Sequence, residues 1–118
     1  MIKKDEIHQC DILWVNFSPS LGHEYRNQRP ALVIQSDESI RKSNLVTVIP
    51  LTSNLKNKTK DDILIIKNDQ NKLFTNSIIK VHTIMSFDHS RFSAKIGRVE
   101  TQVLDQVKAY LKNHFSLS

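Results

Sequence analysis

The sequence predicts a mainly β fold with one C-terminal helix, in which a small, strongly curved sheet or partly open barrel packs against the helix. Five short segments rich in β-branched and other apolar residues occupy the first three-quarters of the chain, and turn-forming residues separate them. In the last part of the chain, after these five segments, the apolar residues instead recur every three or four positions. Few other arrangements fit this much strand and one helix into 118 residues.

The predicted strands cover residues 12–17, 31–35, 45–51, 63–67 and 77–87. Serine, asparagine and aspartate, which form turns by bonding their own backbone, are concentrated between them at residues 36–39, 53–58 and 68–72. The chain has only two glycines, Gly22 and Gly97, so we predict that each is required by its position.

The predicted helix runs from about residue 101 to 114. Its spacing gathers six apolar residues into one stripe: Val103, Leu104, Val107, Tyr110, Leu111 and Phe115. We expect this stripe to pack on the sheet.

Size and composition indicate one domain, spanning residues 1–118, in the cytoplasm. Seventeen Lys and Arg against 12 Asp and Glu give a net charge of +5, which favours an anionic partner. The single cysteine, Cys10, forms no internal disulfide and no metal cluster. No apolar run reaches the length of a signal peptide core or a membrane span.

A polar, basic segment at residues 21–30 leads into the second predicted strand. An arginine at such a junction, Arg29, offers a forked set of donors that fits phosphate oxygens in a fixed geometry. This favours nucleic acid as the partner. The alternative interpretation is that Arg29 pairs with Glu24 or is simply solvated at the strand end.

Four groups of residues in order resemble the MazF/PemK family of toxin endoribonucleases. They are residues 11–19 (DILWVNFSP), 22–24 (GHE) followed by 29–34 (RPALVI), 49–53 (IPLTS), and 76–79 (NSII) followed by Asp88. The resemblance implies an SH3-like small barrel of the MazF/PemK/CcdB type and a homodimer. It also implies sequence-selective cleavage of single-stranded RNA without a metal or other cofactor, and inhibition by a cognate antitoxin protein.

The resemblance places catalytic roles on Arg29 and Thr52. Arg29 would stabilise charge on the phosphorus, because its guanidinium stays protonated and its fork suits the non-bridging oxygens. The hydroxyls of Thr52 and its neighbour Ser53 are suited to the same phosphate. Taken alone, these two residues are more typical of a simple turn after the third strand.

The sequence departs from the family in the fifth predicted strand. The family commonly carries an acidic residue there, and in the PemK branch a basic residue stands two positions before it. This chain has His82 at the acidic position and keeps a basic residue, Lys80, two positions earlier. Strand alternation predicts that both side chains lie on one face. A neutral imidazole can replace a carboxylate as general base, so activity can survive the change; the opposite interpretation is a chain that binds without cleaving.

His23 matches a histidine of the PemK branch, and we predict it to be the opposing acid or a phosphate ligand. RNA also requires basic and planar groups on which bases stack. The predicted RNA-binding residues are Glu24, Tyr25, Arg26, Gln28, Lys56, Lys58, Asn76 and Ile78. Trp14 lies in a dense apolar segment, so we predict that it packs in the core.

A different class of function remains open, because related CcdB toxins use the same barrel to inhibit DNA gyrase and cleave nothing. Arg29 and Thr52 favour the nuclease. The terminal residues 111–115 match the apolar gyrase-binding end of those toxins poorly. An inactive binder of RNA or antitoxin is the third possibility.

Overall fold

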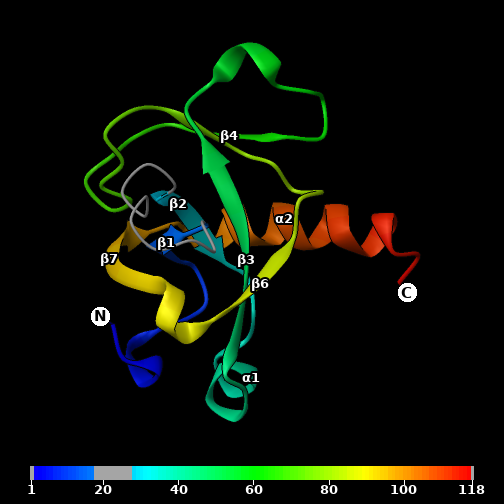
Figure 1. The fold of residues 1–118 in the computed structure, drawn as a ribbon. Helices are drawn as coiled ribbons and strands as arrows, with labels where there is room; N and C mark the ends of the chain where they lie inside the picture. Colours follow the sequence, from blue (N-terminus) through cyan, green and yellow to red (C-terminus); the bar gives the residue numbers. More distant parts are fainter. Residues whose placement is uncertain (1, 18–27, 118) are drawn as a thin grey trace.

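The computed structural model describes residues 2–17 and 28–117, which form a curved antiparallel sheet with a long C-terminal helix (Figure 1). The strands are β1 (Asp11–Asn16), β2 (Gln28–Val33), β3 (Leu45–Thr52), β4 (Ile63–Ile65), β5 (Ser77–Ile79), β6 (Met85–Asp88) and β7 (Phe92–Arg98). The helices are α1 (Asp37–Lys42) and α2 (Thr101–His114), with short 3₁₀ turns η1 (Lys4–Glu6), η3 (Leu55–Asn57) and η4 (His89–Arg91). No helix among these residues has the length and apolar character needed to cross a bilayer.

Strand β3 is the centre of the sheet, whose order is β4-β5-β3-β2-β1-β7 with β6 also beside β3. One edge of β3 pairs with β2, and the other pairs first with β6 and then with β5. The long β3 therefore links two parts of a bent sheet, as its central position in Figure 1 shows. Strands β4 and β7 remain at open edges, so the barrel is not closed. The predicted fold class, mainly β with a C-terminal helix, is confirmed.

Apolar residues fill both faces of the sheet, because strand residues alternate in direction. Along β1, Ile12 belongs to the core cluster under α2, whereas Leu13 belongs to the cluster on the α1 side. Helix α2 buries Leu104 and Val107 in the first cluster, which confirms that its stripe packs on the sheet. The predicted last member of the stripe, Phe115, is instead 55% exposed, because it lies at the C-cap, beyond the last turn.

The predicted fifth strand, residues 77–87, is wrong as one element. It divides into β5 and β6, joined by a turn in which the backbone N–H and the hydroxyl of Thr83 both donate to the Lys80 carbonyl. The predicted turn at residues 36–39 is the start of α1. Ser36 caps this helix by accepting the Ser39 N–H. The sequence already displayed this helix start, because the capping serine is followed by two acidic residues in the first turn, Asp37 and Glu38.

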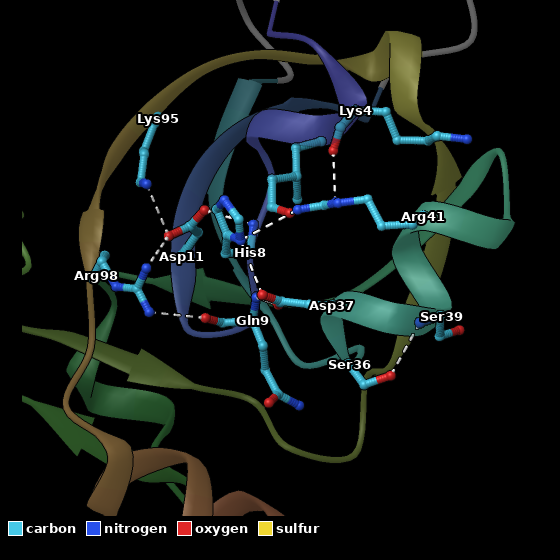
Figure 2. A network of polar contacts seen from close by, with 11 residues as sticks. Lys4, His8, Gln9, Asp11, Ser36, Asp37, Ser39, Arg41, Lys95 and Arg98 are labelled. Carbon is cyan, nitrogen blue, oxygen red and sulfur yellow. Dashed lines mark hydrogen bonds and ion pairs between the residues drawn. The ribbon is translucent and has the colours of Figure 1, made fainter.

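A network of hydrogen bonds and ion pairs links the start of β1 to β7 and α1 (Figure 2). The Asp11 carboxylate is fully buried and accepts the His8 backbone N–H at 2.8 Å. Lys95 and Arg98 of β7 lie 3.1 and 3.3 Å from its Oδ1. His8 Nδ1 in turn lies 2.9 Å from Asp37 of α1, so one network joins β1, β7 and α1.

Gly97 fulfils the prediction that its position requires glycine. A Cβ there would collide with the backbone carbonyl of Asn71. The close approach of the 68–72 turn to β7 therefore excludes any side chain. Gly22 lies outside the described residues.

Candidate active site

Two adjoining cavities open where β2 begins and β3 ends. Arg29, Leu51 and Thr52 line both of them. The smaller, about 290 Å³, is completed by Pro50, Asn54, Asn57, Lys80, His82 and Thr83. The larger, about 400 Å³, is completed by Trp14, Gln28, Pro30, Ser53, Leu73, Phe74, Thr75, Ser77 and Ile96. We call the smaller the polar cavity and the larger the aromatic cavity.

Arg29 is an exposed cation held on a rigid strand. It is the second residue of β2 and lies opposite Val15 of β1, and the next residues of β2, Ala31 to Val33, are fully buried. Its guanidinium carbon lies 5.9 Å from the centre of the Phe17 ring. No ion pair joins Arg29 to a carboxylate among residues 2–17 and 28–117, and Glu24, the suggested partner, lies outside them. Arg29 lines both cavities.

Thr52 ends β3, where it pairs with Ile78 of β5. Its Oγ1 accepts the backbone N–H of Asn54 at 3.2 Å, so it does open a turn. Because that bond uses only a lone pair, the hydroxyl proton is still available to an anion. Ser53 is exposed and lines only the aromatic cavity.

Lys80 and His82 lie in the turn after β5 rather than on a strand, so the premise of strand alternation was wrong. They nevertheless line the same cavity, and both approach one carboxylate, that of Asp62. Lys80 Nζ donates to the Asn57 carbonyl at 3.1 Å and lies 3.3 Å from Asp62 Oδ2. His82 Nδ1 lies 4.0 Å from Asp62 Oδ1.

Asp62 is a site residue that sequence reasoning missed. Its side chain is fully buried, whereas its neighbour Asp61 is exposed. Burial alone raises the pKa of the Asp62 carboxyl, but the Thr59 backbone N–H and the Lys80 ammonium outweigh burial and hold this pKa below its usual value. Nothing in the sequence distinguishes Asp61 from Asp62, because only the pairing of β4 decides which of them faces inward.

Trp14 and Phe74 contribute the aromatic side chains that line the aromatic cavity. The prediction that Trp14 packs in the core is wrong: it is half-buried and lines this cavity, because the core positions of β1 are taken by its neighbours Leu13 and Val15. Phe74, which sequence reasoning did not single out, is 87% exposed at the same cavity. Exposed aromatic faces beside a cation suit an unstacked nucleobase.

The other predicted RNA-binding residues differ in their positions relative to the cavities. Gln28 lines the aromatic cavity beside Arg29. Lys56 and Lys58 are exposed near η3 but line neither cavity. Asn76 lines neither, and its amide oxygen accepts the Lys67 N–H.

Ile78 is a wrong prediction, because its side chain is 0% exposed within β5 and cannot touch a ligand. The remaining predicted site residues lie outside the described residues: His23, Glu24, Tyr25 and Arg26. Among residues 2–17 and 28–117, no three His, Cys, Asp or Glu side chains are grouped as metal ligands would be.

The fold and the cavities together define a class of protein, a small antiparallel β domain in which a polar cavity lined by Arg29 and Lys80 adjoins an aromatic cavity. The comparisons with known proteins agree. A sequence model described as "PemK-like, MazF-like toxin of type II toxin-antitoxin system" matches residues 8–115. This chain belongs to that toxin family.

Relatives and solved structures are similar over nearly the whole chain. Endoribonuclease MazF9 of Mycobacterium tuberculosis is 30% identical over 122 residues, covering 99% of this chain and 98% of that protein. The crystal structure of MazF from Deinococcus radiodurans superposes with a TM-score of 0.75 at 22% identity, covering 93% and 96% of the two chains. An endoribonuclease in complex with its cognate antitoxin, from a mycobacterial species, superposes with a TM-score of 0.73 at 12% identity, covering 95% and 97%. The predicted family is confirmed.

Proposed function

We propose that this chain is the toxin of a type II toxin-antitoxin pair and acts as an endoribonuclease that cleaves single-stranded RNA at selected sequences. The observation that carries the proposal is the polar cavity. Arg29 and Thr52 meet Lys80 and His82 there, although they come from three separate parts of the chain. The relative with 30% identity over 99% of this chain is an endoribonuclease by name.

The proposed reaction uses the 2′-hydroxyl of the RNA as nucleophile. A bond forms between the 2′-oxygen and phosphorus, and the bond from phosphorus to the 5′-oxygen breaks. The products are a 2′,3′-cyclic phosphate and a free 5′-hydroxyl. The 2′-hydroxyl must therefore lose a proton, the phosphoryl oxygens must be stabilised as charge develops, and the leaving oxygen must gain a proton.

Arg29 and Thr52 are proposed to stabilise the developing charge. The guanidinium fork can hold two phosphoryl oxygens, and the Thr52 hydroxyl can donate to one. His82, with 46% of its side chain exposed, is proposed as the base that accepts the 2′-hydroxyl proton. His23 is proposed as the acid that protonates the leaving oxygen.

The aromatic cavity is proposed to hold a base next to the scissile phosphate. It shares Arg29 and Thr52 with the polar cavity, so a base in one and the phosphate in the other belong to adjacent parts of one strand. Stacking on an aromatic face such as that of Phe74 or Trp14 is worth about 1–3 kcal/mol per base.

The proposed partners are a cognate antitoxin and a second copy of the chain. One similar solved structure is an endoribonuclease bound to its cognate antitoxin, which supports the first partner. We expect the antitoxin to inhibit by filling the groove that holds RNA, with the cytoplasm as the compartment where toxin, antitoxin and RNA meet.

The test is to incubate the purified protein with a long mixed-sequence single-stranded RNA in excess EDTA and to map every new 5′ end. Cuts at a defined sequence by the natural protein, and none by Arg29→Ala, are expected. Lys42→Ala is the matched control, because it removes an exposed lysine on α1 that pairs with Glu38 and lines neither cavity. Absence of cuts by folded, antitoxin-free protein would overturn the nuclease and direct attention to gyrase supercoiling.

A further inference from the structure

The two oxygens of the Asp62 carboxylate have unequal surroundings. Oδ2 accepts the Thr59 backbone N–H at 3.0 Å and the Lys80 ammonium at 3.3 Å. Oδ1 is buried and has no hydrogen-bond donor in the described part of the chain. The group in front of it is the His82 imidazole, whose Nδ1 lies 4.0 Å away.

A buried carboxylate oxygen without a hydrogen-bond donor raises the free energy of the folded protein. This arrangement therefore favours any movement that brings a donor to Oδ1. His82 lies in a turn and nearly half of its side chain is exposed, which leaves the ring room to move. A shift of about 1 Å would bring Nδ1–H within hydrogen-bond distance of Oδ1. Asp62 itself is fixed by Thr59 and Lys80, so the ring would move to the carboxylate.

Such a bond would decide which nitrogen of His82 carries the proton. With the proton on Nδ1 and directed to Asp62, Nε2 on the far side of the ring keeps its lone pair. His82 lines the polar cavity together with Arg29 and Thr52, where that lone pair is needed to accept a proton. A carboxylate that orients a histidine in this way is a recurring arrangement in hydrolases.

We propose that Asp62 is a positioning residue of the active site, which holds His82 in the tautomer that can act as base and holds the Lys80 ammonium beside it. The proposal rests on the proposed nuclease function for its catalytic meaning. Among the described residues, the charged groups around the His82 ring are Asp62 from the segment before β4, Lys80 from its own turn and Arg29 from β2. Asp62 is the one carboxylate in this described set, and the tautomer preference is assigned to it.

The first test reports the tautomer and needs no catalysis. Long-range ¹H–¹⁵N NMR spectra at about pH 8, where histidine is ordinarily neutral, distinguish an Nδ1–H ring from an Nε2–H ring. His82→Asn identifies the His82 signals among the five histidines. The natural protein should show the Nδ1–H form, and Asp62→Asn should shift the ring toward Nε2–H. An Nε2–H ring in the natural protein overturns the proposal even if Asp62→Asn does not fold.

The second test is kinetic. Asp62→Asn should lower kcat by about 100-fold or more and leave KM unchanged, since loss of the orienting carboxylate in a serine protease costs roughly 10⁴-fold in kcat. Asp61→Asn is the matched control, because it removes the same charge from the exposed neighbour and should leave kcat unchanged. In a His82→Asn background, Asp62→Asn should lower kcat much less than in the natural background, because the part of its effect that acts through His82 is already lost.

The two tests distinguish a failure of the proposed nuclease function from a failure of the proposed positioning role. If the protein cleaves no RNA but His82 is held as Nδ1–H, the nuclease function fails and the pairing stands. If RNA is cut in EDTA while Asp62→Asn alters neither the tautomer nor kcat, the positioning role fails and the nuclease stands. A lower kcat with an unaltered tautomer would make Asp62 merely structural, and this too would overturn the proposal.

Discussion

Lys80 Nζ lies 3.3 Å from Asp62 Oδ2, which joins the turn after β5 to the segment before β4 across 18 positions of sequence. Asp62 is fully buried, and Lys80 is one-quarter exposed. A buried carboxylate retained in its charged form must be compensated by such partners. The contact therefore links the stability of this end of the sheet to the geometry of the candidate active site.

This contact predicts a loss of stability in acid. Because the pKa of Asp62 is lower in the folded chain than in the unfolded one, its contribution is complete above the unfolded value of about 3.9 and is lost as the pH falls through the folded value. The free energy of unfolding in urea, measured from about pH 6 to 2, should fall less steeply for Asp62→Asn than for the natural protein. Equal slopes would contradict a paired, charged Asp62.

Arg29→Lys should retain the fold and lose most of the cleavage. Lysine keeps the positive charge but not the planar fork, and removal of one such donor from a transition state typically costs about 100- to 1,000-fold in rate. Circular dichroism and single-turnover cleavage of one RNA would measure the two properties. A lysine variant as fast as the natural protein would mean that only a point charge is required.

Phe74→Ala should weaken RNA binding without affecting stability. At 87% exposure the ring contributes little to the core, so the free energy of unfolding should change by less than about 0.5 kcal/mol. Loss of one stacked base should weaken binding by about 5- to 150-fold. Trp14, the only tryptophan, provides a fluorescence signal for titration with uncleavable 2′-deoxy-substituted RNA. Phe115→Ala, also exposed but away from both cavities, should bind normally; an equal effect there would remove the stacking role.

His82→Asp should lower cleavage rather than raise it. The new carboxylate would lie next to the charged Asp62, and two like charges sharing a site oppose one another's ionisation. Because a general base typically contributes about 10²- to 10⁴-fold, we expect a loss of about 100-fold or more in kcat. A gain in kcat would instead mean that the natural histidine is a poor base and that the site lacks a carboxylate at this position.

Asp11 should stabilise the fold mainly through its bond to the His8 N–H. Lys95 and Arg98 are more than one-third exposed and can turn to water if the carboxylate is lost, whereas the backbone N–H cannot (Figure 2). Asp11→Ala should therefore cost about 1–3 kcal/mol in urea denaturation. Asp11→Asn, which keeps an oxygen for that N–H, should cost less. Equal losses for the two variants would assign the effect to the ion pairs.

Most of the fold could be predicted because its signals are local. The segments of β1 to β4 and the stripe of α2 show their periodicity within a few residues, whereas β7 was not predicted. The interruption between β5 and β6 was not predictable in this way, because residues 77–87 are apolar enough throughout to resemble one strand. The break depends on β3, which pairs with β5 at one end and with β6 at the other.

The sequence by itself determined the strand-rich class, the packed C-terminal helix and the choice of Arg29, Thr52, Lys80 and His82 as site candidates. Only the tertiary structure decided that these four line one cavity, that Trp14 faces a cavity while Ile78 is buried, and that Asp62 rather than Asp61 faces Lys80 and His82. The physical reason is that residue type and spacing describe a segment and its two faces. Which face meets another segment is decided by register and by the bend of the sheet, and these arise from contacts between residues distant in sequence.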